Sequence, residues 1–204
     1  KVGIRFGKAP QPDDPHRWDF SAEWIRQSCE GSLRRPGINR IDLYLLHRPD
    51  RLMNPDEVAA VFDELRTAGK VRHFGVSNFT TRQTALLQSR LDFPLINNQL
   101  ELHPLDPTPF IDGTLDHLLQ HRITPTSWSP LAGGRLGDNA PAPDERTRNL
   151  LETLDREAAQ LGIPRANLIV AWLLRHPSGI LPIIGSRTPA RITALAATDN
   201  VGLS

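Results

Sequence analysis

Short apolar runs alternate with longer amphipathic stretches along this chain. Six runs rich in Ile, Val and Leu have the pattern of strands buried on both faces, at residues 1–5, 41–47, 71–77, 95–101, 123–129 and 180–185. Between them lie stretches with apolar residues at helical spacing. This alternation is typical of repeated βα units around a parallel sheet. The pattern therefore predicts an α/β protein.

Helix start and stop signals support the stretches between the predicted strands. Ser21 has the character of an N-cap, and the run at residues 54–57 combines an Asn cap, a Pro at the first helical position and two acids, with Gly69 as a stop. Further helices are expected at residues 80–91, 114–121, 146–161, 165–175 and 188–197. Residues 133–144, dense in Gly, Pro, Asn and Asp, are expected to form a long surface loop.

Two architectures are compatible with such units, an open doubly wound sheet and a closed (β/α)8 barrel. An open sheet that binds a dinucleotide normally carries Gly-x-Gly-x-x-Gly after a strand, and this sequence has no such motif. Polar residues instead follow strand after strand, at the end where a barrel builds its active site. We expect a (β/α)8 TIM barrel with about six of its eight units present and two lying upstream of Lys1. No linker is recognisable, so residues 1–204 are interpreted as one N-terminally truncated domain.

Composition and charge exclude several classes of protein. The 204 residues are 39% hydrophobic and 23% charged, which is ordinary for a soluble domain. The formal charge of +1 gives no global field for a nucleic acid or an anionic membrane. The longest purely apolar run, residues 168–174, is far shorter than the roughly 20 residues that span a bilayer. The single cysteine, Cys29, fits a reducing cytosol, and a cytoplasmic location is expected.

His47 is the first candidate for chemistry, because it ends a run of apolar and aromatic residues. At a barrel mouth its ring could donate a hydrogen bond to a substrate oxygen. The alternative is a structural histidine bonded to a neighbouring carbonyl, which is the more common case for a lone His.

Amide and hydroxyl side chains mark the ends of the next two strands. Ser77 and Asn78 follow the strand at 71–77, where a helix cap is the simpler explanation. Gln99, preceded by two asparagines, interrupts an otherwise apolar strand. An unpaired buried polar group costs about 1–3 kcal/mol, so a ligand with its own carboxamide would be a suitable partner.

The last two strands are followed by small residues and arginines. Trp128, beside Ser129 and Leu131, offers a ring on which a cofactor could stack, although a core tryptophan is at least as common. The runs Gly133-Gly134-Arg135 and Gly185-Ser186-Arg187 suit a phosphate, the second because it opens into a helix N-terminus. No spacing of His, Cys and carboxylates predicts a metal site, and Gly-x-Ser-x-Gly is absent.

Together these strand-end runs resemble the aldo-keto reductase family along essentially the whole chain. The matching segments are residues 42–47, 69–79, 98–104, 128–131 and 182–186. Residues 46–53 and 133–136 are similar to those of bacterial oxidoreductases of the YdhF type.

The resemblance implies hydride transfer between NADPH and a small aldehyde or ketone, with a tetrad of Asp, Tyr, Lys and His. His47 would orient the carbonyl, and Lys1 would lower the pKa of the tyrosine acid. Ser77, Asn78 and Gln99 would hold the nicotinamide carboxamide. The remaining cofactor contacts would come from Trp128, Ser129, Leu131, Gly133, Arg135, Leu136, Gly185, Ser186, Arg187 and Arg191.

Two departures from the family pattern qualify this expectation. The family's Asp and Tyr would lie upstream of Lys1, so the chain by itself is expected to be inactive. Residues 184–186 read Ile-Gly-Ser where many members have Ile-Pro-Lys-Ser, which leaves Arg187 and Arg191 to meet a 2′-phosphate. A small carbonyl is the expected partner, with no nucleic acid or membrane, in a monomer or weak homo-oligomer. The alternative is a nicotinamide-binding regulatory protein with little turnover.

Overall fold

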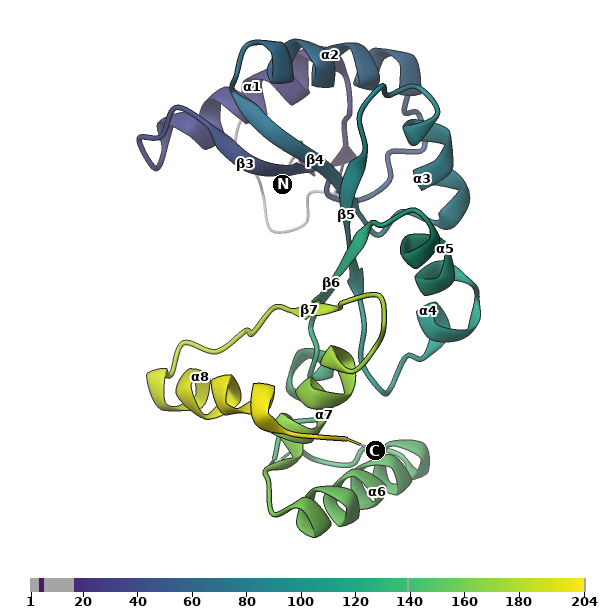
Figure 1. Ribbon diagram of the computed structural model, residues 1–204, viewed down its shortest axis with the longest axis vertical. Helices are drawn as coiled ribbons and strands as arrows, with labels where there is room; N and C mark the ends of the chain where they lie inside the picture. The colour runs from purple at the N-terminus through teal and green to yellow at the C-terminus, as the bar shows by residue number, and fades with distance from the viewer. Residues whose placement is uncertain (1–3, 6–16, 139, 204) are drawn as a thin grey trace. The chain divides into compact units, whose positions relative to one another are not determined.

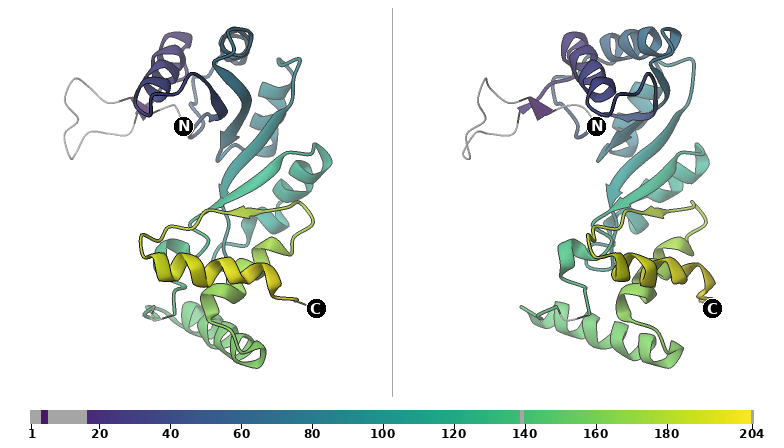
Figure 2. Two further views of the ribbon diagram at one scale, coloured as in Figure 1. Left: turned by 60° about the vertical axis from the view of Figure 1, so that its left-hand side comes forward. Right: turned by 90° about the vertical axis from the view of Figure 1, so that its left-hand side faces the viewer.

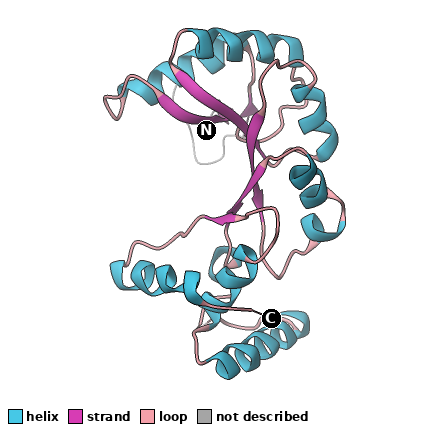
Figure 3. Cartoon of the chain, viewed as in Figure 1, coloured by secondary structure: helices cyan, strands magenta, loops and turns pink. Residues whose placement is uncertain are grey.

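The computed structural model describes residues 4–5, 17–138 and 140–203 of the chain. The chain divides into two units, residues 1–98 and residues 99–204. Both units combine helices with strands (Figure 3).

The strands at 41–101 and 124–182 form one five-stranded sheet in the order β3-β4-β5-β6-β7. Their bounds are Ile41–Leu45 (β3), Val71–Ser77 (β4), Leu95–Glu101 (β5), Thr124–Trp128 (β6) and Leu181–Pro182 (β7). The pairs β3–β4 and β6–β7 are parallel, with Leu43 opposite His73 and Thr126 opposite Leu181. Spatial order follows chain order, which is common when consecutive strands are neighbours in a sheet. Five of the six expected strands are confirmed as members of this sheet.

The first expected strand pairs differently from the prediction. Of residues 1–5, the described pair Ile4–Arg5 (β1) lies antiparallel to Arg17–Trp18 (β2), with Ile4 opposite Trp18. These two strands make a separate two-stranded sheet. Apolar character predicted the extended backbone, but it carried no information on the partner strand, which depends on the rest of the fold.

Capped helices follow the strands of the first unit. They are Ala22–Arg34 (α1), Pro55–Thr67 (α2) and Thr81–Gln88 (α3). Ser21 Oγ accepts a hydrogen bond from Trp24 N, and Asn54 Oδ1 accepts one from Asp56 N, so both predicted caps are confirmed. Helix α2 lies beside α1 and packs on β4 (Figures 1 and 2).

Aromatic and aliphatic side chains from β4 and these helices make the core of the first unit. Phe62 of α2 stacks on Phe74 of β4 with ring centroids 4.1 Å apart, and Phe93 lies 5.5 Å from Phe74. Ile25 and Cys29 of α1 are fully buried in the same cluster. The helices therefore bury the strands on this side of the sheet, as the apolar strand pattern requires.

The second unit contains more helix than the sequence pattern indicated. Its helices are Thr108–Ile111 (α4), Thr114–Gln120 (α5), Ala132–Gly134 (η1), Glu145–Leu161 (α6), Arg165–Leu174 (α7), Pro189–Ala196 (α8) and Ala197–Asn200 (η2). Helix α7 is central, because α6, α8 and η2 all pack against it (Figure 1). It is mostly buried, which agrees with its apolar run. No helix among the described residues is long and apolar enough to cross a membrane.

The segment expected to be a surface loop is only partly one. Leu136 is fully buried and packs with Ala132, Leu151 and Ile169, while Asp144 caps α6 by accepting from Thr147 N at 2.7 Å. Gly, Pro and Asn density predicted irregular backbone correctly. It did not reveal the buried leucine, because a single apolar residue has no periodicity to detect.

Candidate active site and cofactor-binding segments

In the first unit, the ends of β3 and β4 bring three of the candidate residues together. Asn78 Nδ2 donates to the carbonyl of His47 at 3.4 Å and to Ser77 Oγ at 3.0 Å. Asn78 adopts a φ of 59°, a left-handed conformation that Asn tolerates better than most residues. Ser77 is fully buried at the end of β4. The Asn78 side-chain amide thus links the backbone of His47, just after β3, to the Ser77 side chain at the end of β4.

His47 lies two residues beyond the end of β3 and is half-buried. The ring of Trp18 meets it edge-on, with centroids 5.5 Å apart and planes at 86°. Trp18 was not singled out from the sequence, and nothing in its spacing to His47 could have identified it. The aromatic contact restrains the imidazole, which a histidine that orients a substrate needs.

Asn98 of β5 finds one hydrogen-bond partner within the chain, where the sequence suggested that a ligand would pair the polar residues of this strand. Asn98 Nδ2 donates to the carbonyl of Phe79 at 2.9 Å, so this amide holds the turn after β4. Its Oδ1 is buried and has no hydrogen-bond partner in the part of the chain that the structure describes. Gln99, the next residue, is 9% exposed at the start of the second unit. Asn98 is therefore a structural residue whose acceptor could still receive an amide donor.

In the second unit, the turn after β6 has an unusual backbone. Ser129 and Ala132 have φ values of 51° and 52°, and Gly133 and Gly134 have 65° and 97°. Ala132 N donates to the carbonyl of Ser129 at 2.7 Å, which closes the turn next to the half-buried Trp128. Non-glycine residues in this region cost on the order of 1–3 kcal/mol each and concentrate at functional sites. The sequence had no signal for Ala132.

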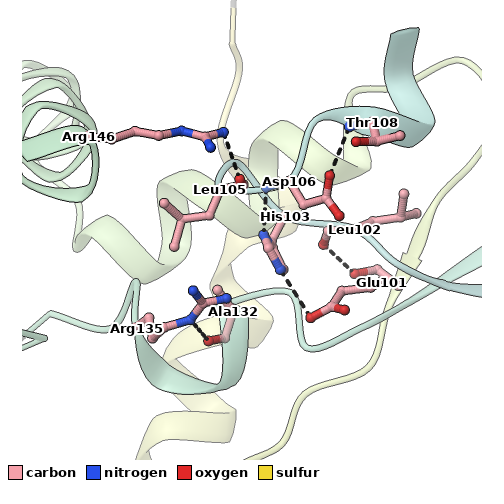
Figure 4. A network of polar contacts seen from close by, with 10 residues as sticks. Glu101, Leu102, His103, Leu105, Asp106, Thr108, Ala132, Arg135 and Arg146 are labelled. Atoms are coloured by element: carbon pink, nitrogen blue, oxygen red, sulfur yellow. Dashed lines mark hydrogen bonds and ion pairs between the residues drawn. The ribbon is translucent and has the colours of Figure 1, made fainter. Parts of the chain in front are cut away.

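Arg135 folds back onto this turn, where its Nε donates to the carbonyl of Ala132 at 3.1 Å (Figure 4). Its side chain is exposed at one wall of a pocket of about 200 Å³. The other walls come from Glu101, His103, Leu105, Asp106, Asp144, Arg146 and Thr147. Sequence reasoning did not identify this pocket, because its residues come from three separated segments.

His103 has a structural role in that pocket. It is 2% exposed, its Nδ1 accepts from Asp106 N at 3.1 Å, and its Nε2 lies 3.2 Å from Glu101 Oε1 (Figure 4). The Nδ1 contact with a backbone N–H places the ring proton on Nε2, facing the carboxylate. Among the described residues no group of His, Cys and carboxylates could hold a metal ion.

The segment before α8 presents arginines and a free helix end. Arg187 of this segment and Arg191 in the first turn of α8 are exposed, and Thr188, the N-cap residue of α8, makes no side-chain capping hydrogen bond. A Cβ built on Gly185 would meet nothing within 4 Å, and its φ is not in the left-handed region. Neither packing nor conformation therefore requires glycine at this position. Open backbone, a helix N-terminus and two arginines fit a phosphate group of a dinucleotide.

Lys1 lies outside the described residues, so the structure gives no position for its side chain. The only tyrosine of the chain, Tyr44, is buried in the first unit, and its hydroxyl donates to the carbonyl of Ile25 at 3.2 Å. Burial raises the pKa of this phenol strongly. Tyr44 is therefore a core residue and unsuited to donate a proton to a substrate.

Comparison with known proteins identifies the family. The model of the aldo/keto reductase family matches residues 1–204. The chain belongs to the aldo/keto reductase family. It is 45% identical to the oxidoreductase YdhF of Escherichia coli over 88% of this chain and 59% of that protein, and 41% identical to the uncharacterized oxidoreductase YcsN of Bacillus subtilis over 95% and 64%. A 6-dehydroglucose reductase of Novosphingobium aromaticivorans is 43% identical over 87% of this chain and 58% of its own length.

Solved aldo/keto reductases share the fold. The thermostable aldo-keto reductase Tm1743, solved with the inhibitor epalrestat, superposes with a TM-score of 0.81 at 25% identity, over 91% of this chain and 64% of that one. An aldo/keto reductase from Klebsiella pneumoniae in complex with NADP and acetate gives 0.75 at 26% identity, over 91% and 62%. The five-stranded sheet is thus consistent with part of a (β/α)8 barrel. The chain spans about three fifths of the length of the curated relatives it matches.

Proposed function

We propose that the protein containing this chain is an NADPH-dependent reductase of small aldehydes or ketones. One observation carries the proposal: the Asn78 amide joins the backbone of His47 to the hydroxyl of Ser77. A residue suited to a carbonyl oxygen and two residues suited to a carboxamide therefore share one hydrogen-bonded cluster. The relatives named as reductases, and the NADP-bound structure from K. pneumoniae, support the same reaction class.

In this proposal the chain's own residues bind the cofactor and orient and polarise the substrate carbonyl. His47 donates a hydrogen bond to the carbonyl oxygen, which stabilises the negative charge that develops there. Ser77, Asn78 and Gln99 bind the carboxamide, and Trp128 packs on the ring. Ser129, Leu131, Gly133, Arg135 and Leu136, with Gly185, Ser186, Arg187 and Arg191, hold the pyrophosphate and the 2′-phosphate. NADPH supplies the hydride when bound.

The proton is assigned to a tyrosine upstream of the chain, with Lys1 lowering its pKa. Tyr44 cannot take that role, because its hydroxyl is committed to the Ile25 carbonyl in the core. The single-domain interpretation of residues 1–204, the cytoplasmic location and the monomeric or weakly associating state remain predictions.

The decisive experiment substitutes His47→Ala in the protein of the relatives' full length. We expect turnover of a generic aldehyde to fall by about 10²–10⁴-fold, the usual contribution of a proton-donating or polarising side chain. NADPH absorbance at saturating cofactor measures the rate. His73→Ala is the matched control, because His73 is an exposed histidine on the neighbouring strand β4.

Three outcomes separate the alternatives. Loss of turnover in His47→Ala with retained NADPH binding supports the role of His47. Full activity in that variant rejects the role. Tight NADPH binding by the unmodified protein without oxidation by any aldehyde in a broad screen would favour the nicotinamide-binding regulatory protein instead.

A further inference from the structure

A buried guanidinium holds the segment that follows β6. Arg165, the first residue of α7, is 6% exposed. Its Nη2 donates to the carbonyls of Gly137 and Asp138, each at 2.7 Å, and its Nη1 donates to Asp155 Oδ2 at 3.1 Å. Three acceptors from two other segments thus converge on one side chain.

Residues 137–138 and the start of α7 are also joined by a hydrogen bond whose donor is on the backbone of α7 and whose acceptor is the Asp138 side chain. Asp138 Oδ1 accepts a hydrogen bond from the backbone N–H of Ala166 at 3.2 Å. Helix α7 has no side-chain cap of its own, because its N-cap residue is Pro164. The carboxylate of Asp138 therefore serves the free amide at the helix start, while Arg165 binds the carbonyl of the same residue. This reciprocal pairing fixes residues 137–138 to the first turn of α7.

The other end of the segment is anchored by packing. Ala132 and Leu136 are buried against Leu151 of α6 and Ile169 of α7. Between Ala132 and Leu136 lie Gly133, Gly134 and Arg135, all exposed and with left-handed backbone at both glycines. Three exposed residues with little side-chain packing are therefore held at both ends by α7.

Stability alone does not account for this arginine. Burial of a charged group is expensive even when it is paired, and apolar replacements of buried ion pairs are often neutral or stabilising. The Nε of Arg165 is buried with no hydrogen-bond partner among the described residues, which adds to the cost. What the side chain does provide is a fixed geometry for two carbonyls, because the guanidinium is planar and rigid.

We propose that Arg165 is a positioning residue that sets residues 132–138 in the conformation that receives the cofactor phosphate. The inference rests on the proposed function, since it assigns that segment to NADPH. Arg165 touches no reacting group, and it acts through the backbone of Gly137 and Asp138. A misplaced binding segment weakens affinity because the ligand must then supply the free energy that orders it.

The test uses the protein of the relatives' full length and four variants. Arg165→Met removes every donor, and Arg165→Lys keeps the charge but offers no planar fork. Asp155→Asn weakens the ion pair and leaves both carbonyl contacts in place. Arg175→Met is the matched control, because Arg175 ends the same helix and is exposed.

Two quantities are measured for each variant: the hydrogen-exchange rates of amides 132–138 without cofactor, and the Kd for NADPH by fluorescence titration. For Arg165→Met we expect faster exchange confined to this segment and a Kd raised about tenfold, a change of ~1.4 kcal/mol. Arg165→Lys should lie between Arg165→Met and the unmodified protein. Asp155→Asn and Arg175→Met should leave both quantities close to those of the unmodified protein. At saturating NADPH the kcat should be retained while the KM for NADPH rises.

Unchanged exchange in both Arg165 variants would overturn the proposal. Faster exchange with an unchanged Kd would also overturn it, because Arg165 would then be structural only. If Arg165→Met does not fold, Arg165→Lys carries both measurements. An unmodified protein that binds no NADPH would reject the proposed function, whereas the exchange rates without cofactor would still show whether Arg165 fixes the segment.

Discussion

Backbone strain at individual residues is concentrated where the sequence placed the chemistry. Among the described residues, the non-glycine positions with positive φ are Asn78, Arg122, Ser129 and Ala132. Asn78 directly follows β4 and Ser129 directly follows β6, while Ala132 lies in the turn after β6; all three are near strand ends that carry candidate cofactor contacts. Strain of this kind persists only where surrounding contacts enforce it, and the Asn78 hydrogen bonds are such contacts.

Gly75, in the middle of β4, is required by close approach of the backbone. A Cβ there would lie 2.6 Å from the carbonyl oxygen of Asn97 and 2.7 Å from the Leu45 side chain. We expect Gly75→Ala to lower the free energy of unfolding by about 3 kcal/mol, the upper end for overpacking a core. Urea denaturation measures the change.

Gly31→Ala is the matched control for that substitution. Gly31 lies inside α1, and its added Cβ would meet only the movable end of the Arg35 side chain. Replacing a glycine inside a helix should raise stability by about 0.5–1 kcal/mol. Equal effects of the two substitutions would contradict the assignment of Gly75 as a packing constraint.

Tyr44 gives a stability prediction at alkaline pH. Burial raises the pKa of its phenol above the ordinary value of 10.0. The folded state is therefore more stable when the phenol is neutral than when it is ionised. The stabilisation is fully present below pH 10 and is lost as the pH rises further, because only the unfolded chain ionises easily. The unfolding midpoint, measured from pH 8 to pH 11, should fall above pH 10.

Tyr44→Phe identifies the residue responsible. At neutral pH the variant should be less stable by about 1 kcal/mol, because the Ile25 carbonyl loses its donor. Its stability should fall less steeply above pH 10. Burial also raises the pKa of Cys29, so a residual alkaline slope is expected. An identical slope in the variant and the unmodified protein would show that Tyr44 does not titrate in this way.

At the scale of elements, caps and hydrophobic periodicity predicted most helices. The lengths of the strands were predicted less well. Ser21 and Asn54 cap α1 and α2 as expected. Strand β7 is only two residues long, although the apolar run continues to residue 185. An apolar run shows that backbone is buried or paired somewhere, whereas pairing length depends on the neighbouring strand.

Helix α3 tests the capping interpretation of the segment after β4. Thr80 Oγ1 accepts from Gln83 N at 3.3 Å, and Gln83 Oε1 accepts from Thr80 N at 3.0 Å. Thr80→Ala should cost about 1 kcal/mol of unfolding free energy. The comparison is Thr81→Ala, one position inside the helix, which should have a smaller effect in the same urea titration. A larger loss for Thr81→Ala would contradict the capping box.

At the scale of the whole molecule, the content of tyrosine limits what the chain can do. Tyr44 is its only tyrosine, and that hydroxyl is buried and bonded. The 204-residue chain by itself should therefore show no oxidation of NADPH by an aldehyde, while the protein of the relatives' full length should show it. Absorbance of NADPH measures both. Equal turnover by the two would reject the assignment of the acid to an upstream tyrosine.

The sequence determined the class of fold, the positions of the parallel strands and the family. Alternating apolar runs and capped helices specify βα units locally, because each unit must bury both faces of its strand. The strand-end motifs are short and contiguous, and they could be recognised without knowing what surrounds them.

Only the tertiary structure decided which partners those residues have. The strand Ile4–Arg5 pairs with Arg17–Trp18, and the ring of Trp18 contacts the ring of His47. The Asn98 side chain donates a hydrogen bond to the Phe79 carbonyl, and the Arg165 side chain donates to the carbonyls of Gly137 and Asp138. The physical reason is that local propensity acts between near neighbours in the chain. Side-chain pairs far apart in sequence are selected only when packing has brought their elements together.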